Sequence, residues 1–274
     1  MAIIEMNCIS QSLRRTVTVN VIIPLDKKPL PGMPAREDKP FKTLYLLHGG
    51  YGNYTDWVNG TRIQRWAEEQ NLVVVMPSGD NKFYVDIPDL GDYYGKFIGE
   101  ELVEFTRKMF PLSHKKEDTY IAGLSMGGYG ATVNGLKYSD TFGYIGSFSA
   151  GYMMDDIANN TEFAQIAKFG PKFFEIMFGP DPLNSEYHYK YLAKKLVDEG
   201  KELPKLYIAV GTEDFLYKNI KDYCTFLDDI GYDYTYEEGP GGHEWDFWDR
   251  YIKRFMDWLP LEEKTSGLNS GNVR

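Results

Sequence analysis

The sequence is short of several features that would indicate a secreted, membrane-spanning or nucleic-acid-binding protein. Only two of its 274 residues are cysteines, Cys8 and Cys224, too few for the disulfide framework of a small secreted domain. No apolar run is long enough to span a bilayer, and the N-terminus lacks the basic region and apolar stretch of a signal peptide. These absences predict a cytoplasmic protein with reduced cysteines.

Positive charge is also scarce, because 30 Lys and Arg residues stand against 40 Asp and Glu residues, for a formal net charge of −10. The basic residues gather in no segment, which argues against the phosphate contacts of a nucleic-acid-binding protein. The same balance disfavours an anionic membrane surface and is typical of simple solubility. We therefore predict a small-molecule partner, with no nucleic acid and no membrane, and a homo-oligomer stays open.

What the sequence does contain is an alternation of short apolar runs with helical segments. Residues 3–23 are rich in β-branched side chains and predict strand, and the proline-rich residues 24–40 are interpreted as a hairpin connection within one domain. Further strands are predicted at 43–47, 72–76, 119–122, 144–149, 206–210 and 234–237, and helices at 61–70, 97–109, 125–138, 218–230 and 245–258. This order predicts an α/β fold with a mostly parallel sheet and helices on both faces.

One segment interrupts the alternation. Residues 151–190 are rich in Phe, Met and Tyr, and they predict an insertion over the active site of a single domain at 1–260. The polar residues 261–274 predict a frayed tail. Because parallel sheets place their sites beyond the carboxyl ends of the strands, the loops after the strands are where chemistry is expected.

A Gly-x-Ser-x-Gly pattern at residues 123–127 is the most informative motif in the chain. It follows the predicted strand 119–122 and opens the predicted helix 125–138, the context in which a serine is raised above a sheet on a strained turn. The pattern alone also arises by chance, so the strand and helix around it carry the argument. We predict that Ser125 is a nucleophile and not part of a turn without chemistry.

A serine hydroxyl needs a base within hydrogen-bond reach, and the chain has only four histidines. Enzymes with this serine turn carry their residues in the order nucleophile, acid, histidine, and only His243 satisfies that order. It follows the last predicted strand and the flexible residues 239–242. His114 and His188 lie in polar segments, whereas His48 directly follows a buried strand and is expected to order the turn there.

The acid is expected after the strand 206–210, where Glu213 and Asp214 are neighbours. We favour Asp214, since the shorter carboxylate on a turn is the usual partner of the imidazole, and Glu213 stays the alternative. The tetrahedral intermediate also needs fixed backbone N–H donors. One is expected from Met126, directly after the nucleophile, and the other from Gly50 in a glycine-rich loop that lacks the features of a phosphate-binding loop.

At these residues the chain resembles the esterase D-like group of α/β-hydrolases, which includes tributyrin-type esterases, cinnamoyl and feruloyl esterases, and S-formylglutathione hydrolases. The resemblance rests on His48 to Gly52 with Trp57, on Gly123 to Gly128, on Gly211 to Tyr217 and on Gly242 to Trp245, and it spans nearly the whole chain. It implies the α/β-hydrolase fold and a Ser-His-Asp triad that needs no metal and no cofactor. The chain departs from the group at Gly50, where relatives often carry a larger apolar residue.

Aromatic residues near the predicted loop ends are candidates for an acyl or alcohol pocket, and packing of loops onto the sheet is the alternative. The candidates are Trp57, Tyr152, Phe215, Tyr217 and Trp245, with Phe83 and Tyr84 beside them. We predict a serine carboxylesterase that acts through an acyl-enzyme on acetyl, butyryl or hydroxycinnamoyl esters. The alternatives are an S-formylglutathione hydrolase-type thioesterase, a sugar acyltransferase, and a non-catalytic binding protein, which would usually have lost a triad residue.

Overall fold

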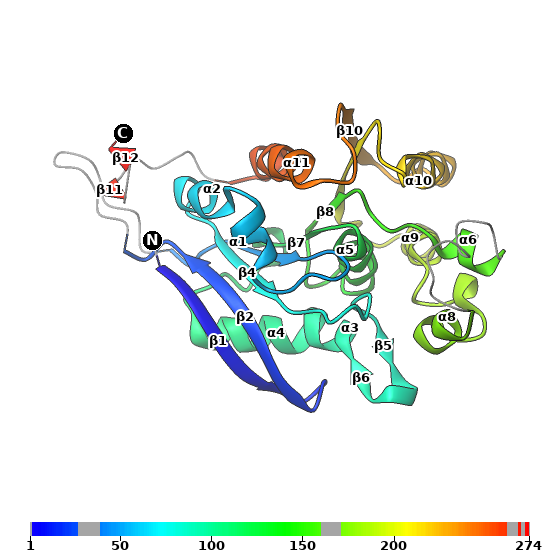
Figure 1. Cartoon of the computed structure of the whole chain (residues 1–274), viewed down its shortest axis with the longest axis horizontal. Helices are drawn as coiled ribbons and strands as arrows, with labels where there is room; N and C mark the ends of the chain where they lie inside the picture. Colours follow the sequence, from blue (N-terminus) through cyan, green and yellow to red (C-terminus); the bar gives the residue numbers. More distant parts are fainter. Residues whose placement is uncertain (1, 27–38, 160–170, 262–267, 270–271, 274) are drawn as a thin grey trace.

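An eight-stranded sheet forms the centre of the computed structural model, which describes residues 2–26, 39–159, 171–261, 268–269 and 272–273 (Figure 1). Its strands are β1 (Ala2–Ser10), β2 (Arg15–Ile23), β3 (Thr43–Leu47), β4 (Val73–Pro77), β7 (Thr119–Leu124), β8 (Tyr144–Phe148), β9 (Lys205–Gly211) and β10 (Tyr234–Gly239). They lie in the order β1-β2-β4-β3-β7-β8-β9-β10. The six strands from β4 to β10 are parallel to one another, and β1 and β2 are antiparallel. The predicted α/β fold with a mostly parallel sheet is confirmed.

The N-terminal region differs from the prediction in two ways. Residues 3–23 form a hairpin of two antiparallel strands and not one strand, because residues 11–14 make a turn in which Arg14 has a φ of 52°. The loop after β2 is also not a hairpin connection, since β2 pairs with β4 and β3 lies beyond β4. Residues 27–38 of that loop lie outside the described part of the chain.

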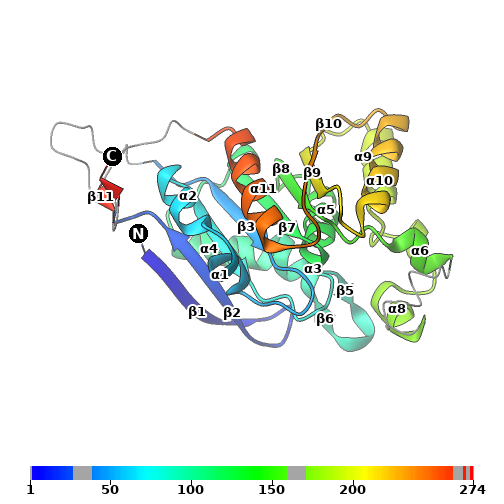
Figure 2. The same ribbon diagram turned by 45° about the horizontal axis from the view of Figure 1, so that its top comes forward.

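Helices cover both faces of the sheet, because successive residues of each buried strand point to opposite sides. On β3, Tyr45 and Leu47 belong to one hydrophobic cluster, whereas Leu44 and Leu46 belong to the other. The helices are α1 (Asp56–Gly60), α2 (Ile63–Glu69), α3 (Tyr94–Lys96), α4 (Leu102–Met109), α5 (Met126–Lys137), α6 (Met154–Ala158), α8 (Pro171–Phe178), α9 (Tyr189–Asp198), α10 (Tyr217–Asp229) and α11 (Trp245–Trp258). Side chains of α1, α2 and α11 pack on one face, and those of α4, α5, α9 and α10 pack on the other (Figure 2).

The five predicted helices are all found, and the longest of the helices that were not predicted is α9. Helix α9 was not predicted, although its buried residues Tyr189, Leu192, Ala193 and Leu196 have helical spacing. The predicted insertion at 151–190 contains α6 and α8, which lie near α9 at the β10 end of the sheet (Figure 1), and residues 160–170 lie outside the described part. In the predicted tail, Leu268–Asn269 pairs with Asn272–Val273. Within the described ranges, no helix has the length and apolarity to cross a membrane.

Candidate active site

Ser125 lies on the sharp turn between β7 and α5, at φ 54° and ψ −118°. A non-glycine residue in such a conformation costs about 1–3 kcal/mol, so the surrounding structure must hold it. The end of β8 does so, because the Ser125 N–H donates to the Phe148 carbonyl at 2.9 Å and its carbonyl accepts from the Gly151 N–H at 2.9 Å. The serine side chain is thus fixed at the carboxyl end of the parallel strands.

Two glycines allow this turn. A Cβ on Gly127 would lie 2.5 Å from the backbone oxygens of Leu47 and His48, and a Cβ on Gly123 would lie 2.3 Å from the oxygen of Gly127. These neighbours are backbone atoms that cannot move aside. The glycines of the motif are therefore required by close packing of α5 against the loop after β3.

His243 connects Ser125 to Asp214. The His243 Nε2 lies 2.9 Å from Ser125 Oγ, and Nδ1 lies 3.0 Å from Asp214 Oδ2 and 3.2 Å from Oδ1. Because an ionised carboxylate only accepts hydrogen bonds, Nδ1 carries the hydrogen and the Nε2 lone pair faces the serine hydroxyl. The structure thus brings the predicted nucleophile, base and acid into one hydrogen-bonded chain.

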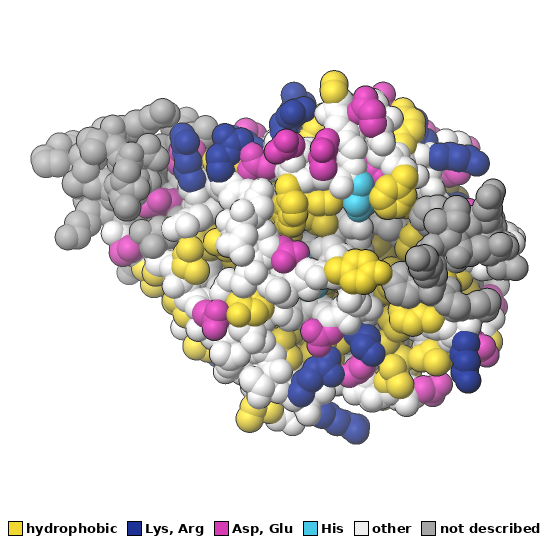
Figure 3. Space-filling model, in the orientation of Figure 1, with side chains coloured by type: hydrophobic (Ala, Val, Ile, Leu, Met, Phe, Trp, Pro, Cys, Tyr) yellow, Lys and Arg dark blue, Asp and Glu magenta, His cyan; other side chains and the backbone are white. Residues whose placement is uncertain are grey.

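Burial changes along this chain of groups. The Asp214 side chain is 0% exposed, whereas that of His243 is 20% exposed. Burial of Asp214 alone would raise its pKa, but the hydrogen bonds that its carboxylate accepts, first of all from His243, lower the pKa below its ordinary value. The acid therefore stays ionised beneath a histidine that reaches the surface. Figure 3 shows a histidine (cyan) exposed to solvent near α10, α11 and β10, with hydrophobic side chains (yellow) beside it.

Glu213, the alternative acid, has a different place. Its carboxylate accepts a hydrogen bond from the Gly241 N–H at 2.6 Å, and its own N–H donates to the Gly241 carbonyl at 3.1 Å. That hydrogen bond lowers the pKa of Glu213 below its ordinary value. The two neighbouring carboxylates therefore have different contacts. Asp214 contacts the imidazole of His243, and Glu213 fixes the loop that carries His243.

The predicted oxyanion donors lie on either side of Ser125. Met126 is the first residue of α5, so no earlier turn of the helix supplies an acceptor for its N–H. Across from it, a Cβ on Gly49 would lie 3.4 Å from the Ser125 Cβ, which places the loop after β3 against the serine. Among the described residues, no hydrogen bond occupies the N–H of Gly50. Both N–H groups are therefore available for an oxyanion.

The loop that carries Gly50 is held from behind by residues 79–84. The His48 ring contacts the Gly49 carbonyl through Nδ1 at 2.7 Å, and its Nε2 accepts from the Gly79 N–H at 2.8 Å. Burial lowers the pKa of His48, which keeps the ring neutral for both bonds. Tyr84 donates to the His48 carbonyl at 3.0 Å, so His48 does order this turn as expected.

Asn81 completes that support, because its Oδ1 accepts from the Tyr51 N–H at 2.5 Å. Asp80, Asn81, Phe83 and Tyr84 all have positive φ between 46° and 57°. Four such residues in one loop are uncommon and indicate that the loop's shape is set by its contacts. These supporting residues were not predicted, since no sequence motif marks them.

The aromatic candidates fall into two groups. Trp57 and Tyr152 are each only 1% exposed and belong to the core, where Trp57 donates to the Leu47 carbonyl at 2.9 Å and the Tyr152 hydroxyl bonds to Thr132 and Ser147. Both rings are covered, which favours the alternative that these two pack onto the sheet. Phe83 and Tyr84 are buried as well.

The other candidates keep some exposed surface. Phe215 is 62% exposed and its ring centroid lies 4.7 Å from that of His243. Trp245 packs edge-on against Trp57 with centroids 5.6 Å apart, and the Tyr217 hydroxyl donates to Glu238 at 2.9 Å. Of the three, Phe215 contacts the reactive groups.

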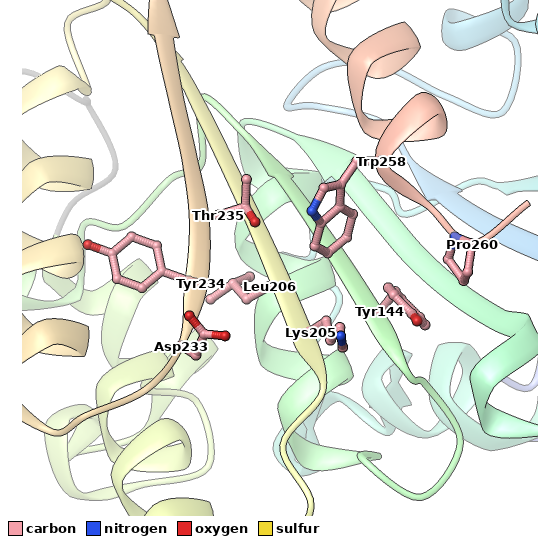
Figure 4. Close-up of a pocket in the computed structure, with 8 residues that line it drawn as sticks. All are labelled: Tyr144, Lys205, Leu206, Asp233, Tyr234, Thr235, Trp258 and Pro260. Atoms are coloured by element: carbon pink, nitrogen blue, oxygen red, sulfur yellow. The ribbon is translucent and has the colours of Figure 1, made fainter.

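A concavity of about 300 Å³ lies at the end of the sheet opposite to Ser125, where β8, β9 and β10 begin (Figure 4). Tyr144, Lys205, Asp233 and Trp258 are among its lining residues. It is separate from Ser125, which follows the carboxyl end of β7. Within the described ranges, no three His, Cys, Asp or Glu side chains are grouped to hold a metal ion.

Comparisons with known proteins find similarity to esterases. Residues 10–257 match the model of the Esterase family, which carries the description "Putative esterase". An acetyl esterase of Caldicellulosiruptor saccharolyticus is 40% identical over 261 residues, which cover 94% of this chain and 98% of the relative.

Two solved structures from Staphylococcus aureus are similar over 94% of this chain and 98% of theirs. The fluorophosphonate-binding serine hydrolase FphF has 33% identity and a TM-score of 0.82. The S-formylglutathione hydrolase FrmB has 32% identity and a TM-score of 0.75. With the hydrogen-bonded Ser125, His243 and Asp214, these matches identify the chain as a member of the Esterase family, a carboxylic ester hydrolase with the α/β-hydrolase fold.

Proposed function

We propose that the protein is a serine carboxylesterase in which Ser125 is the nucleophile, His243 the general base and Asp214 the acid that orients it. The observation that supports this most directly is the unbroken hydrogen-bonded chain from Asp214 through His243 to Ser125 Oγ. The arrangement has the geometry that nucleophilic catalysis requires, with the base in reach of the hydroxyl and a third group behind the base.

The reaction follows from these positions. Ser125 Oγ attacks the ester carbonyl carbon while His243 Nε2 takes the hydroxyl proton, and the carbonyl electrons move to the oxygen. The N–H groups of Gly50 and Met126 stabilise that oxyanion. When the intermediate collapses, His243 returns the proton to the departing alcohol and leaves an acyl-Ser125. Water then attacks the acyl group with the same proton transfers and releases the carboxylic acid.

Small esters are the proposed substrates, with acetyl esters first. The similarity to an acetyl esterase at 40% identity supports this choice. Tyr51 is 85% exposed beside Gly50, and Phe215 is exposed beside His243, so apolar groups of a substrate would contact an aromatic ring on each side of Ser125. Butyryl and hydroxycinnamoyl esters are the next candidates. We place the enzyme in the cytoplasm, with a small-molecule ester as its partner and a homo-oligomer still open.

A thioesterase of the S-formylglutathione hydrolase type is the second candidate, because FrmB is similar in both sequence and structure. The same residues would attack a thioester, since the carbonyl carbon and oxyanion are equivalent. Transfer of the acyl group to a sugar hydroxyl in place of water is a third outcome. Product analysis with a sugar acceptor would separate transfer from hydrolysis.

The test of the proposal is Ser125→Ala, measured with p-nitrophenyl acetate. We expect turnover to fall to the level of uncatalysed hydrolysis while the far-UV circular dichroism stays unchanged. The control is Ser147→Ala, which removes a buried serine hydroxyl that bonds to Tyr152 at 2.8 Å. Substantial turnover by Ser125→Ala would disprove the assignment. A panel of acetate, butyrate, methyl ferulate and S-formylglutathione then ranks the substrate classes by kcat/KM.

A further inference from the structure

Strand β1 forms one edge of the eight-stranded sheet and pairs only with β2, in an antiparallel register that includes all nine of its residues. Within the described ranges, no hydrogen bond joins the backbone of residues 3–10 to any segment other than β2. Figure 1 shows β1 at the outer margin of the molecule, beyond β2. Alternate N–H and C=O groups of β1 therefore point away from the sheet, where they can pair with another strand.

Strand β1 also lacks the features that commonly protect an edge from other chains. Its sequence AIIEMNCIS contains no Lys, Arg or Pro and only one acidic residue, Glu5. The opposite edge strand, β10, has six residues, among them Glu237 and Glu238, and Glu237 forms an ion pair with Arg254. Long edge strands without basic residues or proline are the ones to which strands of another chain add. Of the two edges of this sheet, β1 is therefore the one suited to pairing.

The solvent-facing side chains of β1 have a symmetric order. They are Ile3, Glu5, Asn7 and Ile9, so that two polar residues lie between two isoleucines. Ile9 is 74% exposed and Ile3 is 41% exposed. Single exposed isoleucines are ordinary on a protein surface. Their symmetric placement along an unpaired edge is what indicates a symmetric partner.

A second copy of β1 fits this edge when the two strands run antiparallel about a two-fold axis at Met6. In that register Ile3 faces the partner's Ile9, Glu5 faces the partner's Asn7, and Met6 faces its own counterpart. Each exposed isoleucine thereby meets another, and the two carboxylates stay apart. An axis at Glu5 would place two carboxylates together, and an axis at Asn7 would place Glu5 against the partner's Ile9. The axis at Met6 is therefore the favoured one.

The polar pair in this register has both a donor and an acceptor available. Thr18 Oγ1 donates to Asn7 Oδ1 at 2.7 Å within the hairpin, so the Asn7 Nδ2 group remains a donor. Tyr54 donates to Glu5 Oε2 at 3.1 Å, which leaves Oε1 of that carboxylate as an acceptor. Asn7 can thus donate to the partner's Glu5, and the two-fold axis repeats this contact.

The inward face of β1 fits the same partner. Ala2, Ile4, Met6 and Cys8 are partly buried and pack against one of the two hydrophobic clusters. Because the sheet ends at β1, these side chains keep part of their surface exposed. In the register centred on Met6, Ile4 lies against the partner's Cys8 and the two methionines meet on the axis. The hydrophobic layer would then continue from one copy into the other, which removes apolar surface from water.

We propose that two copies of this protein associate through β1, in the antiparallel register centred on Met6, so that their two sheets join into one. Such an interface is isologous, since the same residues contribute from both sides. The inference does not depend on the proposed function, because Ser125 follows β7 in the middle of the sheet and β1 lies at its edge.

The first experiment measures the molar mass of the full-length protein by analytical ultracentrifugation over a concentration series. We expect a dimer. Ile3→Lys places a charge against the partner's Ile9 at both ends of the interface, so the dissociation constant should rise about a hundredfold. The matched control is Ile176→Lys on α8, since Ile176 is 40% exposed and Ile3 is 41% exposed. This control should keep the wild-type dissociation constant.

Far-UV circular dichroism and turnover of p-nitrophenyl acetate check that both variants are folded, and both should match the wild type. A wild-type protein that is monomeric at every concentration would overturn the proposal. So would a dimer that Ile3→Lys leaves intact, or one that both variants dissociate equally.

Asn7→Asp tests the register with a side chain of nearly the same shape. It keeps the acceptor for Thr18 but places a carboxylate against the partner's Glu5 twice, so the dissociation constant should rise about tenfold. Adding Glu5→Lys to Asn7→Asp puts opposite charges at the same two places, and this double variant should again associate at least as tightly as the wild type. A double variant that associates no better than Asn7→Asp would refute the register.

Disulfide formation gives an independent measurement, made with Cys8→Ser so that Cys224, which is buried, is the remaining native thiol. Met6→Cys places two thiols on the axis, where opposed Cα atoms lie about 4.5–5.5 Å apart and can be bridged. The control is Ile9→Cys, whose two copies would lie about 20 Å apart along the strands. Under mild oxidation only Met6→Cys should give a covalent dimer on a non-reducing gel. Absence of that dimer, or equal cross-linking of both variants, would contradict the proposal.

Discussion

The two sides of Ser125 are built in different ways. On the acid–base side, His243 and Asp214 are connected through side-chain hydrogen bonds whose direction depends on which group carries the hydrogen. On the proposed oxyanion side, the groups are the backbone N–H donors of Gly50 and Met126, and the loop 79–84 holds the chain at Gly50. The chemical identity of the side chains therefore matters on the acid–base side, and the shape of the backbone matters on the oxyanion side. Substitutions should separate the two.

The largest expected effect is on the acid–base side. Asp214→Asn should lower kcat by about 10³–10⁴-fold, because an amide cannot hold the histidine in the tautomer with Nδ1–H toward the acid. Glu213→Gln is the matched control, since its amide oxygen can still accept from the Gly241 N–H. Steady-state kinetics with p-nitrophenyl acetate measures both. A severe loss in Glu213→Gln with a mild one in Asp214→Asn would reverse the assignment of the acid.

The next effect tests shape on the oxyanion side. In Gly127→Ala the new methyl group would meet backbone oxygens at 2.5 Å, so the free energy of unfolding should fall by about 3 kcal/mol, together with activity. At Gly50 a Cβ would meet only Asn81 Oδ1, at 3.9 Å. Gly50→Ala should therefore change the unfolding free energy by less than about 0.5 kcal/mol. Urea denaturation compares them, and equal losses would contradict the packing argument.

Asn81→Ala is expected to have a smaller effect. It removes the acceptor of the Tyr51 N–H and loosens the peptide next to Gly50, so kcat should fall about tenfold. The pH profile should stay that of the wild type, because His243 is untouched. Asn81→Asp keeps both the acceptor and a side chain that tolerates positive φ, and it should restore most of the activity. A shifted acid limb in Asn81→Ala would remove the distinction between the two sides.

The smallest effect concerns stability and pH. Burial lowers the pKa of His48, so the unfolded chain binds a proton at a higher pH than the folded protein does. The free energy of unfolding should therefore decrease as the pH falls below about 6.5, the ordinary value for histidine. Burial lowers the pKa of His188 in the same way. Urea denaturation at pH 7.5 and 5.5 should show this decrease, reduced in His48→Gln and in His188→Gln. An unchanged slope in both variants would exclude these histidines as its source.

Much of the proposed site was located from the sequence, because the groups to which we assign the reaction follow strands in a fixed order. The serine pattern, the acid after the strand 206–210 and the late histidine are local features, and the sheet brings their loops together. Helix 245–258 also has the bounds that its apolar spacing predicts. Local sequence patterns therefore predict those features that depend on apolar spacing and on the order of residues along the chain.

The features that the sequence did not predict depend on burial and on tertiary contacts. Trp57 and Tyr152 are aromatic residues of the kind that lines substrate pockets, yet tertiary packing covers both side chains. Ser149 follows the end of β8, and Trp248 lies on the amphipathic helix α11. The hydrogen bond from the Trp248 indole to Ser149 Oγ depends on how α11 crosses the sheet. No spacing in the sequence encodes a contact between residues 99 positions apart.

The parallel sheet has a consequence for how this protein acquires its activity. Ser125 and His243 are separated by 118 positions, and Asp214 and His243 by 29, so the site consists of non-local contacts. Such contacts form only after long loops have closed, which makes their assembly slow compared with helix formation. The helices can therefore be present before any hydrolysis is possible. Recovery of activity during refolding should report the moment at which β7, β8, β9 and β10 are paired in one sheet.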